Sequence, residues 1–300
     1  MPPKSPDDFV EKLTEGSISS VFAISNKTIK LTRHNKEYLD LVLSDKTGTI
    51  NGRMFSNGKL HEDYQSLNNG DICSIEGNVE VFKGMMTVKI SHIQKCEEKE
   101  YIITDFKKSS DNDSKEMMGE ILETIDQITR TELKSLLELF FNDEKFVKTF
   151  CEAPAAKRMH HNYAGGLLEH TLHVLKICKT VCSSYPKLDC DLLFTGAILH
   201  DIGKMKTYDY HGPTIEFSDD GLLLEHIYIS AQMVKEKSAK ILISEETVKK
   251  VIHLILSHHG EIRNGWGSAV NPFLAEATAL HYADNLDAKI KIALDKNRTL

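Results

Sequence analysis

The most distinctive chemistry in this sequence belongs to two adjacent residues, His200 and Asp201. They follow an almost wholly apolar run, Leu192–Leu199, which predicts a helix that enters a core. Burying an imidazole and a carboxylate side by side costs free energy unless something pairs with them, and a divalent metal ion is the usual partner. A single His-Asp pair is more often a helix cap or a surface feature, so the rest of the chain must decide between the two interpretations.

Further histidines and an aspartate lie in the C-terminal half, each within or at the end of a segment with apolar periodicity. They are His170, His226, His258, His259 and Asp284. Imidazole and carboxylate groups without thiolates suit Mn²⁺, Fe²⁺, Zn²⁺, Mg²⁺ or Ni²⁺, and the set is large enough for two ions. We assign the first ion to His170, His200, Asp201 and Asp284, and the second to His226, His258 and His259, with Asp201 bridging. Two divalent ions roughly 3.5–4 Å apart can direct a hydroxide onto phosphorus, so the set predicts phosphoester hydrolysis.

The elements that must position these groups are helices, because apolar residues recur at helical intervals through the C-terminal part of the chain. The predicted helices include Glu116–Phe150, Leu167–Cys182, Gly221–Lys237, Glu245–His259 and a last helix that begins at Pro272. In the last helix Asp284 lies on a stripe of core residues, where an unpartnered carboxylate would be costly. His258 and His259 end their helix, where an imidazole could instead act as a capping cation. The sequence therefore predicts an all-helical bundle over residues 116–300.

The first 95 residues have the period of strands instead of helices. The predicted strands are Ser17–Leu31, Tyr38–Leu43, Thr49–Phe55, Asp71–Phe82 and Met85–Ile93, with tight turns at 45–48 and 83–84. Five strands in so short a segment predict a small closed all-β barrel over residues 1–95. Residues 96–115 are charged and then rich in Ser, Asp and Asn, which indicates a linker between two domains.

The strand order of the first domain resembles an OB-fold, a barrel that binds single-stranded nucleic acid. Such folds offer aromatic rings to the bases and basic side chains to the backbone. The candidates here are Arg33, Tyr38, Arg53, Phe55, Phe82 and Lys89. A barrel of this size also needs rings in its core, so packing is the alternative role of each ring. The domain has twelve Lys and Arg against twelve Asp and Glu, so its sequence shows no strong basic stripe.

Length and composition bound the class of protein. Three hundred residues with 41% apolar content are enough for two domains with cores of their own. The N-terminal residues do not read as a signal peptide, and no segment reaches the roughly 20 apolar residues of a membrane span, so we expect a cytoplasmic protein without a membrane partner. The six cysteines show no CxxC spacing, which favours reduced thiols. A net charge of −7 argues against bulk electrostatic coating of nucleic acid but allows a local groove.

The order H…HD…H…HH…D over residues 155–295 resembles the HD-domain superfamily of metal-dependent phosphohydrolases. The segments HHNYAGGLLEHT and ILHDIGK, together with the preceding OB-fold, are similar to the YhaM family of 3′→5′ exoribonucleases. This resemblance covers nearly the whole chain. It implies a hydrolase that releases nucleoside monophosphates from the 3′ end of single-stranded RNA, with Mn²⁺ as the favoured metal and with single-stranded DNA as a further substrate to consider.

The same resemblance implies catalytic roles for four residues. His200 and Asp201 form the namesake pair, and Lys204 and His161 are the candidates for contacting a substrate phosphate. The alternative role for His161 is structural, as a histidine at the surface or at a hinge whose hydrogen bonds are already satisfied. The family pattern has glycine before the downstream histidine, as in LLGHI, whereas this chain has Glu225, which either tunes the second metal site or faces solvent.

Two other functions stay open on the sequence alone. The first keeps the helical active site but makes the substrate a nucleotide or a cyclic nucleotide. The second is a non-catalytic single-strand-binding protein, such as a replication-associated factor, whose helical domain is only structural. Intact ligands at every motif position speak against the second alternative, and the combination of an OB-fold with an HD domain favours the exoribonuclease. The number of subunits, with a homo-oligomer among the alternatives, stays open as well.

Overall fold

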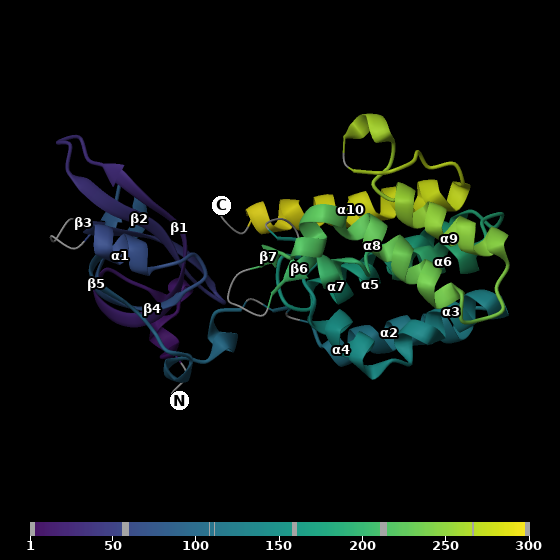
Figure 1. The fold of residues 1–300 in the computed structure, drawn as a ribbon, viewed down its shortest axis with the longest axis horizontal. Coiled ribbons are helices and arrows are strands. Elements are labelled where there is room, and N and C mark those ends of the chain that lie inside the picture. The colour runs from purple at the N-terminus through teal and green to yellow at the C-terminus, as the bar shows by residue number, and fades with distance from the viewer. Residues whose placement is uncertain are drawn as a thin grey trace. The chain divides into compact units, whose positions relative to one another are not determined.

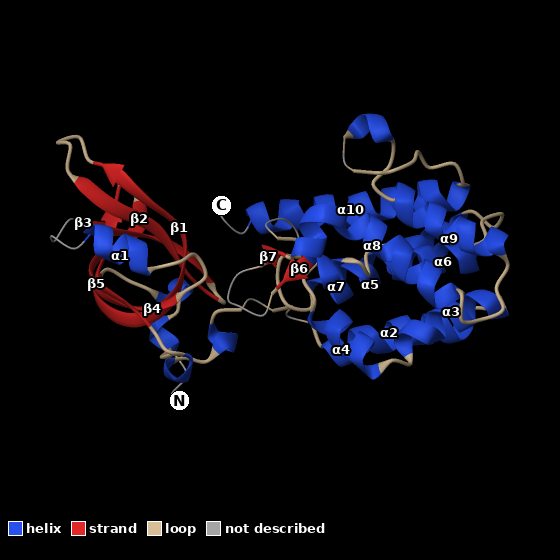
Figure 2. Ribbon diagram, viewed as in Figure 1, coloured by secondary structure: helices blue, strands red, loops and turns tan. Residues whose placement is uncertain are grey.

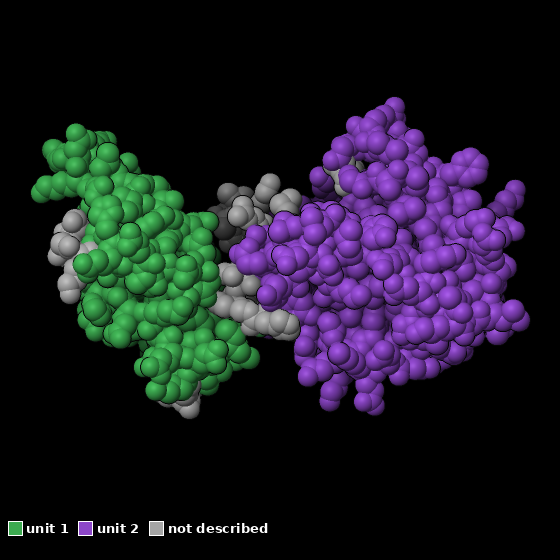
Figure 3. Space-filling model, viewed as in Figure 1, with its two compact units in different colours: residues 1–108, 211–214 green, residues 109–210, 215–300 purple. Residues whose placement is uncertain are grey.

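The computed structural model describes residues 4–55, 60–107, 109–110, 112–157, 161–210, 215–265 and 267–297. The chain divides into two compact units, residues 1–108 and residues 109–300 apart from 211–214 (Figure 3). Strands dominate the first unit and helices dominate the second (Figure 2). The fold class predicted from the sequence, an OB-fold barrel followed by a helical domain, is confirmed.

The strands of the first unit close into a barrel in the order β1, β2, β3, β5, β4. They are β1 (Gly16–Leu31), β2 (Glu37–Asp45), β3 (Gly48–Phe55), β4 (Ile72–Phe82) and β5 (Met85–Lys95), with the short helix α1 (Leu60–Ser66) between β3 and β4 (Figure 1). β1 is long enough to pair with β4 through its first half and with β2 through its second. A parallel ladder between β3 and β5, residues 51–54 with residues 87–90, closes the barrel.

Alternate residues of these strands fill the barrel, and the intervening residues face outward. The buried set includes Phe22, Ile24, Leu41, Leu43 and Ile75. β4 and β5 approach so closely that a Cβ atom at Gly77 would lie 2.3 Å from the carbonyl oxygen of Lys89, so only glycine fits there. The outward residues are therefore the ones that the barrel can present to a ligand.

The second unit is a helical bundle built around one buried helix, α6. Its helices are α2 (Ser114–Gln127), α3 (Thr131–Phe141), α4 (Glu144–Glu152), α5 (Gly166–Ser184), α6 (Cys190–Leu199), α7 (Lys204–Thr207), α8 (Asp219–Ser238), α9 (Glu245–Ser257) and α10 (Ala275–Asn297). α6 packs against α5, α9 and α10, and its last two turns are almost wholly buried. A helix that is apolar on all faces lies inside a bundle. His200 directly follows the last residue of this buried helix.

The region that the sequence predicts as one helix, residues 116–150, is three helices. The first break is held by Asp191, whose Oδ2 accepts hydrogen bonds from the backbone N–H groups of Thr129 and Arg130 at 2.9 and 2.8 Å. The second break comes before α4, where the side chain of Asp143 caps the new helix. Apolar spacing alone does not show these breaks, because they depend on hydrogen bonds to side chains.

Two further details of the second unit differ from the prediction. The last helix begins at Ala275 and not at Pro272. The backbone N–H of Phe273 donates to Nε2 of His253 at 2.9 Å, and the Phe273 side chain is 89% exposed. A two-stranded hairpin of β6 (Tyr208–Asp209) and β7 (Glu216–Phe217) interrupts a region that was expected to be helical throughout.

Candidate metal centre and nucleic-acid face

The end of α6 places His200 and Asp201 in the interior of the bundle. α6 and α9 lie so close together that a Cβ atom at Gly196 would lie 2.4 Å from Cδ2 of Leu254. His200 and Asp201 are 0% and 1% exposed. An imidazole and a carboxylate are therefore buried side by side, and such groups need partners.

The four residues assigned to the first ion lie together. Nε2 of His170 is 3.1 Å from Oδ1 of Asp284 and 3.4 Å from Oδ2 of Asp201. Nε2 of His200 is 3.2 Å from the same Asp201 oxygen and 3.3 Å from Nε2 of His170. Residues from α5, the end of α6 and α10 thus direct two imidazoles and two carboxylates at one point.

The three residues assigned to the second ion lie on the other side of Asp201. Its Oδ1 atom is 3.4 Å from Nε2 of His226 and 3.6 Å from Nε2 of His258. The ring centroid of His259 is 4.2 Å from that of His258 and 5.2 Å from that of His226. The Asp201 carboxylate therefore lies between the two groups, with one oxygen toward each.

The second group contains buried polar atoms that the protein itself does not satisfy. Among the described residues, the buried side-chain atoms without a hydrogen-bond partner include Oδ1 of Asp201, Nε2 of His226, Nε2 of His258 and Nδ1 of His259. Unsatisfied buried groups of this kind are rare because each carries a desolvation penalty. One carboxylate oxygen and three imidazole nitrogens gathered in this way fit a divalent metal ion, which binds nitrogen and oxygen donors of these types.

The ionisation states of His258, His259 and Asp201 also suit metal binding, which requires neutral imidazoles and ionised carboxylates. Burial holds the pKa of His258 well below its usual value, and burial together with the neighbouring His226 lowers the pKa of His259 to about 4. Burial alone would raise the pKa of Asp201, but the adjacent Lys204 and His200 hold it well below its usual range. At neutral pH His258 and His259 therefore offer neutral nitrogens beside the Asp201 carboxylate anion.

Two of the imidazoles beside Asp201, those of His200 and His258, are held by their other nitrogen. Nδ1 of His200 donates to the carbonyl oxygen of Ala197 at 2.8 Å, and Nδ1 of His258 donates to that of Ile255 at 2.7 Å. Both histidines directly follow a helix, where carbonyl groups of the last turn have no partner within the helix. These bonds set the tautomer with Nε2 toward Asp201, so the helix ends themselves aim the ligands.

His170 is held in a different way, by a carboxylate that the sequence reasoning overlooks. Its Nδ1 atom is 2.7 Å from Oδ2 of Asp287 in α10. Asp287 is three residues after Asp284, on the same face of the helix. The sequence signal that could have identified Asp287 was a second carboxylate one helical turn after Asp284 on a stripe of core residues.

Lys204 lies beside the carboxylate that the two groups share. Its Nζ atom donates to Oδ2 of Asp201 at 2.5 Å, and the lysine is 7% exposed. Burial would lower the pKa of Lys204, but Asp201 raises it, so the pair is ionised. Gly203 lets this turn pack on α8, because a Cβ atom there would lie 2.2 Å from the carbonyl oxygen of His226.

His161 is the other candidate for contacting a substrate phosphate. It is fully buried, with Nε2 3.0 Å from Oδ2 of Asp287 and Nδ1 2.9 Å from the hydroxyl of Tyr163. Both ring nitrogens are therefore engaged by protein groups, behind His170. This geometry does not support the expected contact between His161 and a substrate phosphate.

Glu225, the departure from the family pattern, has an unusual backbone conformation. It interrupts α8 with φ 62° and ψ 155°, a region that is essentially restricted to glycine. Its Oε2 atom is 3.4 Å from Nδ1 of His226, and its side chain is 64% exposed. The carboxylate thus both contacts a candidate ligand and faces solvent.

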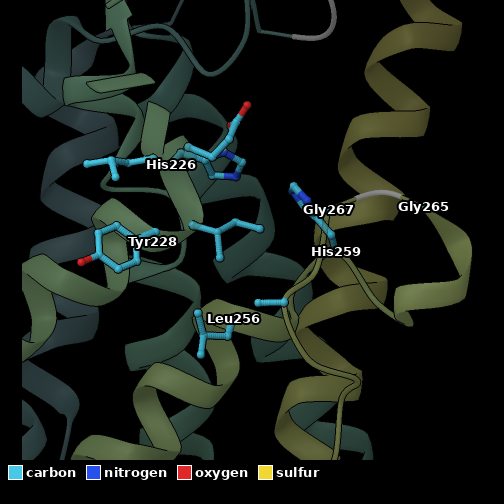
Figure 4. Close-up of a pocket in the computed structure, with 10 residues that line it drawn as sticks. His226, Tyr228, Leu256, His259, Gly265 and Gly267 are labelled. Carbon is cyan, nitrogen blue, oxygen red and sulfur yellow. The ribbon is translucent and has the colours of Figure 1, made fainter. Parts of the chain in front are cut away.

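A cavity of about 500 Å³ opens beside the second group. Leu224, Ile227 and Leu256 supply apolar walls, and His226 and His259 lie at one end with their rings toward one another (Figure 4). A volume of this size accommodates a small ligand such as one nucleotide. The candidate ligands are therefore accessible from an open, mostly apolar pocket.

Five of the six candidate nucleic-acid-binding residues lie on outward positions of neighbouring barrel strands. The rings of Tyr38 and Phe55 stack with centroids 5.5 Å apart across β2 and β3. The guanidinium carbon of Arg53 is 4.4 Å from the centroid of the Phe82 ring, and Arg53 pairs with Lys89 across β3 and β5. Phe55 and Phe82 are 44% and 40% exposed, so these rings are not core residues.

The remaining candidate, Arg33, is exposed in the turn between β1 and β2 and is not on these strands. Arg53 also pairs with Asp40, its Nε atom 3.3 Å from Oδ1, so the face carries both signs of charge. The second and third strands are the usual ligand-binding strands of an OB-fold. We call the outward group of Tyr38, Arg53, Phe55, Phe82 and Lys89 the aromatic face.

Two domain families match the chain. Residues 15–95 match an OB-fold nucleic acid binding domain, and residues 167–289 match an HD domain. Together with the buried histidines and aspartates, these matches define an HD-domain protein that carries an N-terminal OB-fold. Among the described residues, no helix is both long and apolar enough to cross a membrane.

Several curated relatives share both domains. The 3′-5′ exoribonuclease YhaM of Bacillus licheniformis is 32% identical over 90% of this chain and 84% of its own length. The proteins of the same name from Shouchella clausii and Bacillus subtilis are 32% identical over 92% of this chain, and the alignments cover 85% and 86% of their own lengths. The chain belongs to the YhaM family of 3′-5′ exoribonucleases. A solved structure, the second OB-fold domain of replication protein A from Methanococcus maripaludis, is 22% identical and covers 30% of this chain and 93% of its own, with a TM-score of 0.23, which is too weak a likeness for any conclusion.

Proposed function

We propose that this protein is a metal-dependent 3′→5′ exoribonuclease that hydrolyses single-stranded RNA and releases nucleoside monophosphates. Membership of the YhaM family supports the activity. The observation that carries the proposal is the Asp201 carboxylate, buried between two groups of histidines and with an unsatisfied oxygen toward the second. A helical domain with only a structural role has no reason to bear that cost.

Two divalent ions, with Mn²⁺ favoured, would supply water activation and charge neutralisation at the scissile phosphate when bound. We assign the first ion to His170, His200, Asp201 and Asp284, and the second to His226, His258 and His259, with Asp201 shared. Lys204 keeps Asp201 ionised and adds a positive charge that favours an anionic substrate. The cavity beside His226 and His259 would give one nucleotide a place to enter.

The aromatic face would hold the substrate strand by stacking bases on Phe55 and Phe82 and by attracting the backbone with Arg53 and Lys89. Because both units are in one chain, a strand held by the barrel would be presented to the helical unit at a raised effective concentration. The proposal further includes a cytoplasmic location and single-stranded DNA as a second substrate.

Digestion of single-stranded RNA that carries a label at one end tests this function. With Mn²⁺, RNA labelled at the 3′ end should release a labelled mononucleotide at once, and RNA labelled at the 5′ end should shorten progressively. Excess chelator and the variant Asp201→Asn should both stop the release. Cleavage of nucleotides but not of RNA would instead indicate a nucleotide phosphohydrolase, and binding of intact RNA without any cleavage would indicate a non-catalytic binding protein.

A further inference from the structure

The His170 ring lies between two carboxylates of the same helix. Oδ1 of Asp284 is 3.1 Å from Nε2 of His170, and Oδ2 of Asp287 is 2.7 Å from its Nδ1. The two aspartates are one turn apart in α10, so their side chains reach the same ring from one face of the helix. Of the two ring nitrogens, Nε2 faces the candidate metal centre and Nδ1 faces away from it.

Asp287 is itself held firmly. Besides His170, its Oδ2 accepts from Nε2 of His161 at 3.0 Å, and its Oδ1 accepts from Nδ1 of His173 at 2.9 Å. The aspartate is 6% exposed. Three imidazole donors on two oxygens leave this side chain little freedom to rotate away from His170.

The carboxylate on Nδ1 distinguishes His170 from the other anchored ligands. His200 and His258 donate to neutral backbone carbonyl oxygens, which their own helices provide. His170 lies within the first turns of α5, where the carbonyl groups ahead of it are used by the helix, so its anchor must come from another element. A carboxylate anchor forms a stronger, charge-assisted hydrogen bond and makes the far nitrogen a better metal ligand.

We propose that Asp287 is a positioning residue, which fixes His170 with Nε2 toward the first metal ion. The inference rests on the proposed function, since it concerns the metal ion of that same site. Asp287 does not touch the candidate substrate region, and it acts only through His170. His161 gains a role from the same arrangement, because its bond to Asp287 helps hold the carboxylate in place.

A titration of metal-free protein with Mn²⁺ alone tests this role. In Asp287→Asn, Mn²⁺ affinity at the first site should fall about 10- to 100-fold, the usual effect of losing a partner of a metal-bound histidine. Affinity at the second site should stay within about twofold, because its histidines do not contact Asp287. RNA hydrolysis should need correspondingly more Mn²⁺ for half-maximal rate and should recover most of its maximal rate when Mn²⁺ is saturating.

A matched control is Asp191→Asn. Asp191 also accepts three hydrogen bonds, from the backbone N–H and the hydroxyl of Thr129 and from the backbone N–H of Arg130, but it contacts no candidate ligand. This variant should lower the melting temperature without changing Mn²⁺ affinity. Equal loss of Mn²⁺ affinity in both variants would mean that Asp287 acts only through stability, and would overturn the proposal.

A spectroscopic readout needs no variant. With Zn²⁺ bound, long-range ¹H–¹⁵N correlation spectra of wild-type protein should show His170 with a proton on Nδ1 and none on Nε2. The opposite tautomer would overturn the proposal, as would wild-type Mn²⁺ affinity in Asp287→Asn. Loss of one whole ion from Asp287→Asn, with the remaining ions bound at wild-type affinity, would mean that His161, His170 and Asp287 hold a cation of their own, and would also overturn it.

The outcomes separate this inference from the proposed function. If the wild-type protein binds Mn²⁺ but does not shorten RNA, the exoribonuclease proposal fails, whereas the role of Asp287 is still decided by the titration. If the wild-type protein shortens RNA and Asp287→Asn binds Mn²⁺ normally, only the role of Asp287 fails. If the wild-type protein binds no divalent ion, both fail.

Discussion

The two units of this protein place their polar groups in opposite ways. In the barrel, the rings and cations of the aromatic face are exposed, as with Phe55 at 44%, and a carboxylate of the neighbouring strand pairs with Arg53. In the helical unit, His170, His200 and Asp201 are at most 1% exposed, and several of the atoms around Asp201 lack partners. A binding face can be assembled from groups that water would satisfy anyway, whereas this buried cluster has a cost that only function explains.

The difference also bears on how well each region can be recognised. An exposed arginine or phenylalanine costs little wherever it occurs, so its presence says little about its role. A buried histidine beside a buried aspartate is expensive, so its role is constrained. The comparison predicts that substitutions in the helical unit abolish RNA hydrolysis, whereas substitutions on the aromatic face raise KM for long single-stranded RNA and leave the maximal rate intact.

The largest expected effect comes from Asp201→Asn. Hydrolysis of RNA should fall by more than about 100-fold, because Asp201 is shared by both groups of ligands. Loss of a residue that only hydrogen-bonds to a metal ligand costs up to about 100-fold, and loss of a shared ligand should cost more. Affinity for single-stranded RNA should change by less than about twofold, since the aromatic face is untouched. Initial rates and fluorescence-anisotropy binding on the same preparation measure the two effects. Loss of binding in step with loss of cleavage would remove the distinction between the units.

The next effect comes from the aromatic face. Stacking of one base on an aromatic ring contributes about 1–3 kcal/mol, so Phe55→Ala combined with Phe82→Ala should raise KM for long single-stranded RNA about 10-fold or more. The maximal rate, and the rate on a dinucleotide, should be unchanged. Exchange of the fully buried Phe22 for Leu is the control, which should lower stability without a selective change in KM. An unchanged KM in the double variant would assign the aromatic face to another role.

Lowering the pH should give a smaller effect, a loss of folding stability that is confined to the helical unit. The Thr247 hydroxyl, the Ser244 backbone N–H and Arg130 lower the pKa of Glu132 to about 2. A lowered carboxyl pKa stabilises the fold fully above the unfolded value of about 4.5, and this contribution is lost as the pH falls from about 4.5 to about 2. After allowance for solvent screening it amounts to about 1–2 kcal/mol.

The check is thermal unfolding of Glu132→Gln and wild type across this pH range. The variant should be less stable than wild type at pH 7, and the two should converge as the pH approaches 2. A transition assigned to the barrel should shift equally in both proteins. A difference that persists unchanged at pH 2 would mean that the charge of Glu132 is not the stabilising feature.

The smallest effect concerns the backbone at Glu225. Glu225→Gly should relieve a conformation that is costly for a residue with a Cβ atom, with a net gain of about 1 kcal/mol after the entropy cost of glycine. Glu225→Ala keeps the Cβ atom and should not gain stability. Melting temperatures of the two variants measure the contrast. Equal stability of glycine and alanine at this position would show that the backbone strain carries no cost.

Much of the fold was predictable because its signals are local. The barrel strands alternate and are separated by turn residues, and the observed strands β1 to β5 match the predicted ones closely. The first break in residues 116–150 and the late start of α10 were not predictable in this way. They depend on Asp191 reaching Thr129 and on His253 reaching Phe273, which are contacts between residues distant in the sequence.

The candidate site shows the same division. The residue types and their order indicated that seven side chains would meet, and in the structure they lie together, with Asp201 between the two groups. The groups that hold His170 were not assigned, because the role of Asp287 depends on its bond to His170 and the role of His161 depends on its bond to Asp287. The positive φ of Glu225 was also hidden, since a glutamate gives no local sign of a conformation that normally requires glycine.

The parallel ladder that closes the barrel has a consequence for its resistance to opening. The described part of this seam joins only residues 51–54 to residues 87–90, whereas the other ladders are longer. Amide hydrogens along the seam should therefore exchange with solvent sooner than those between β4 and β5. Arg53 and Lys89 are paired across the seam. An RNA backbone that contacts both cations would therefore stabilise the closed barrel and slow the exchange of the amide hydrogens along the seam.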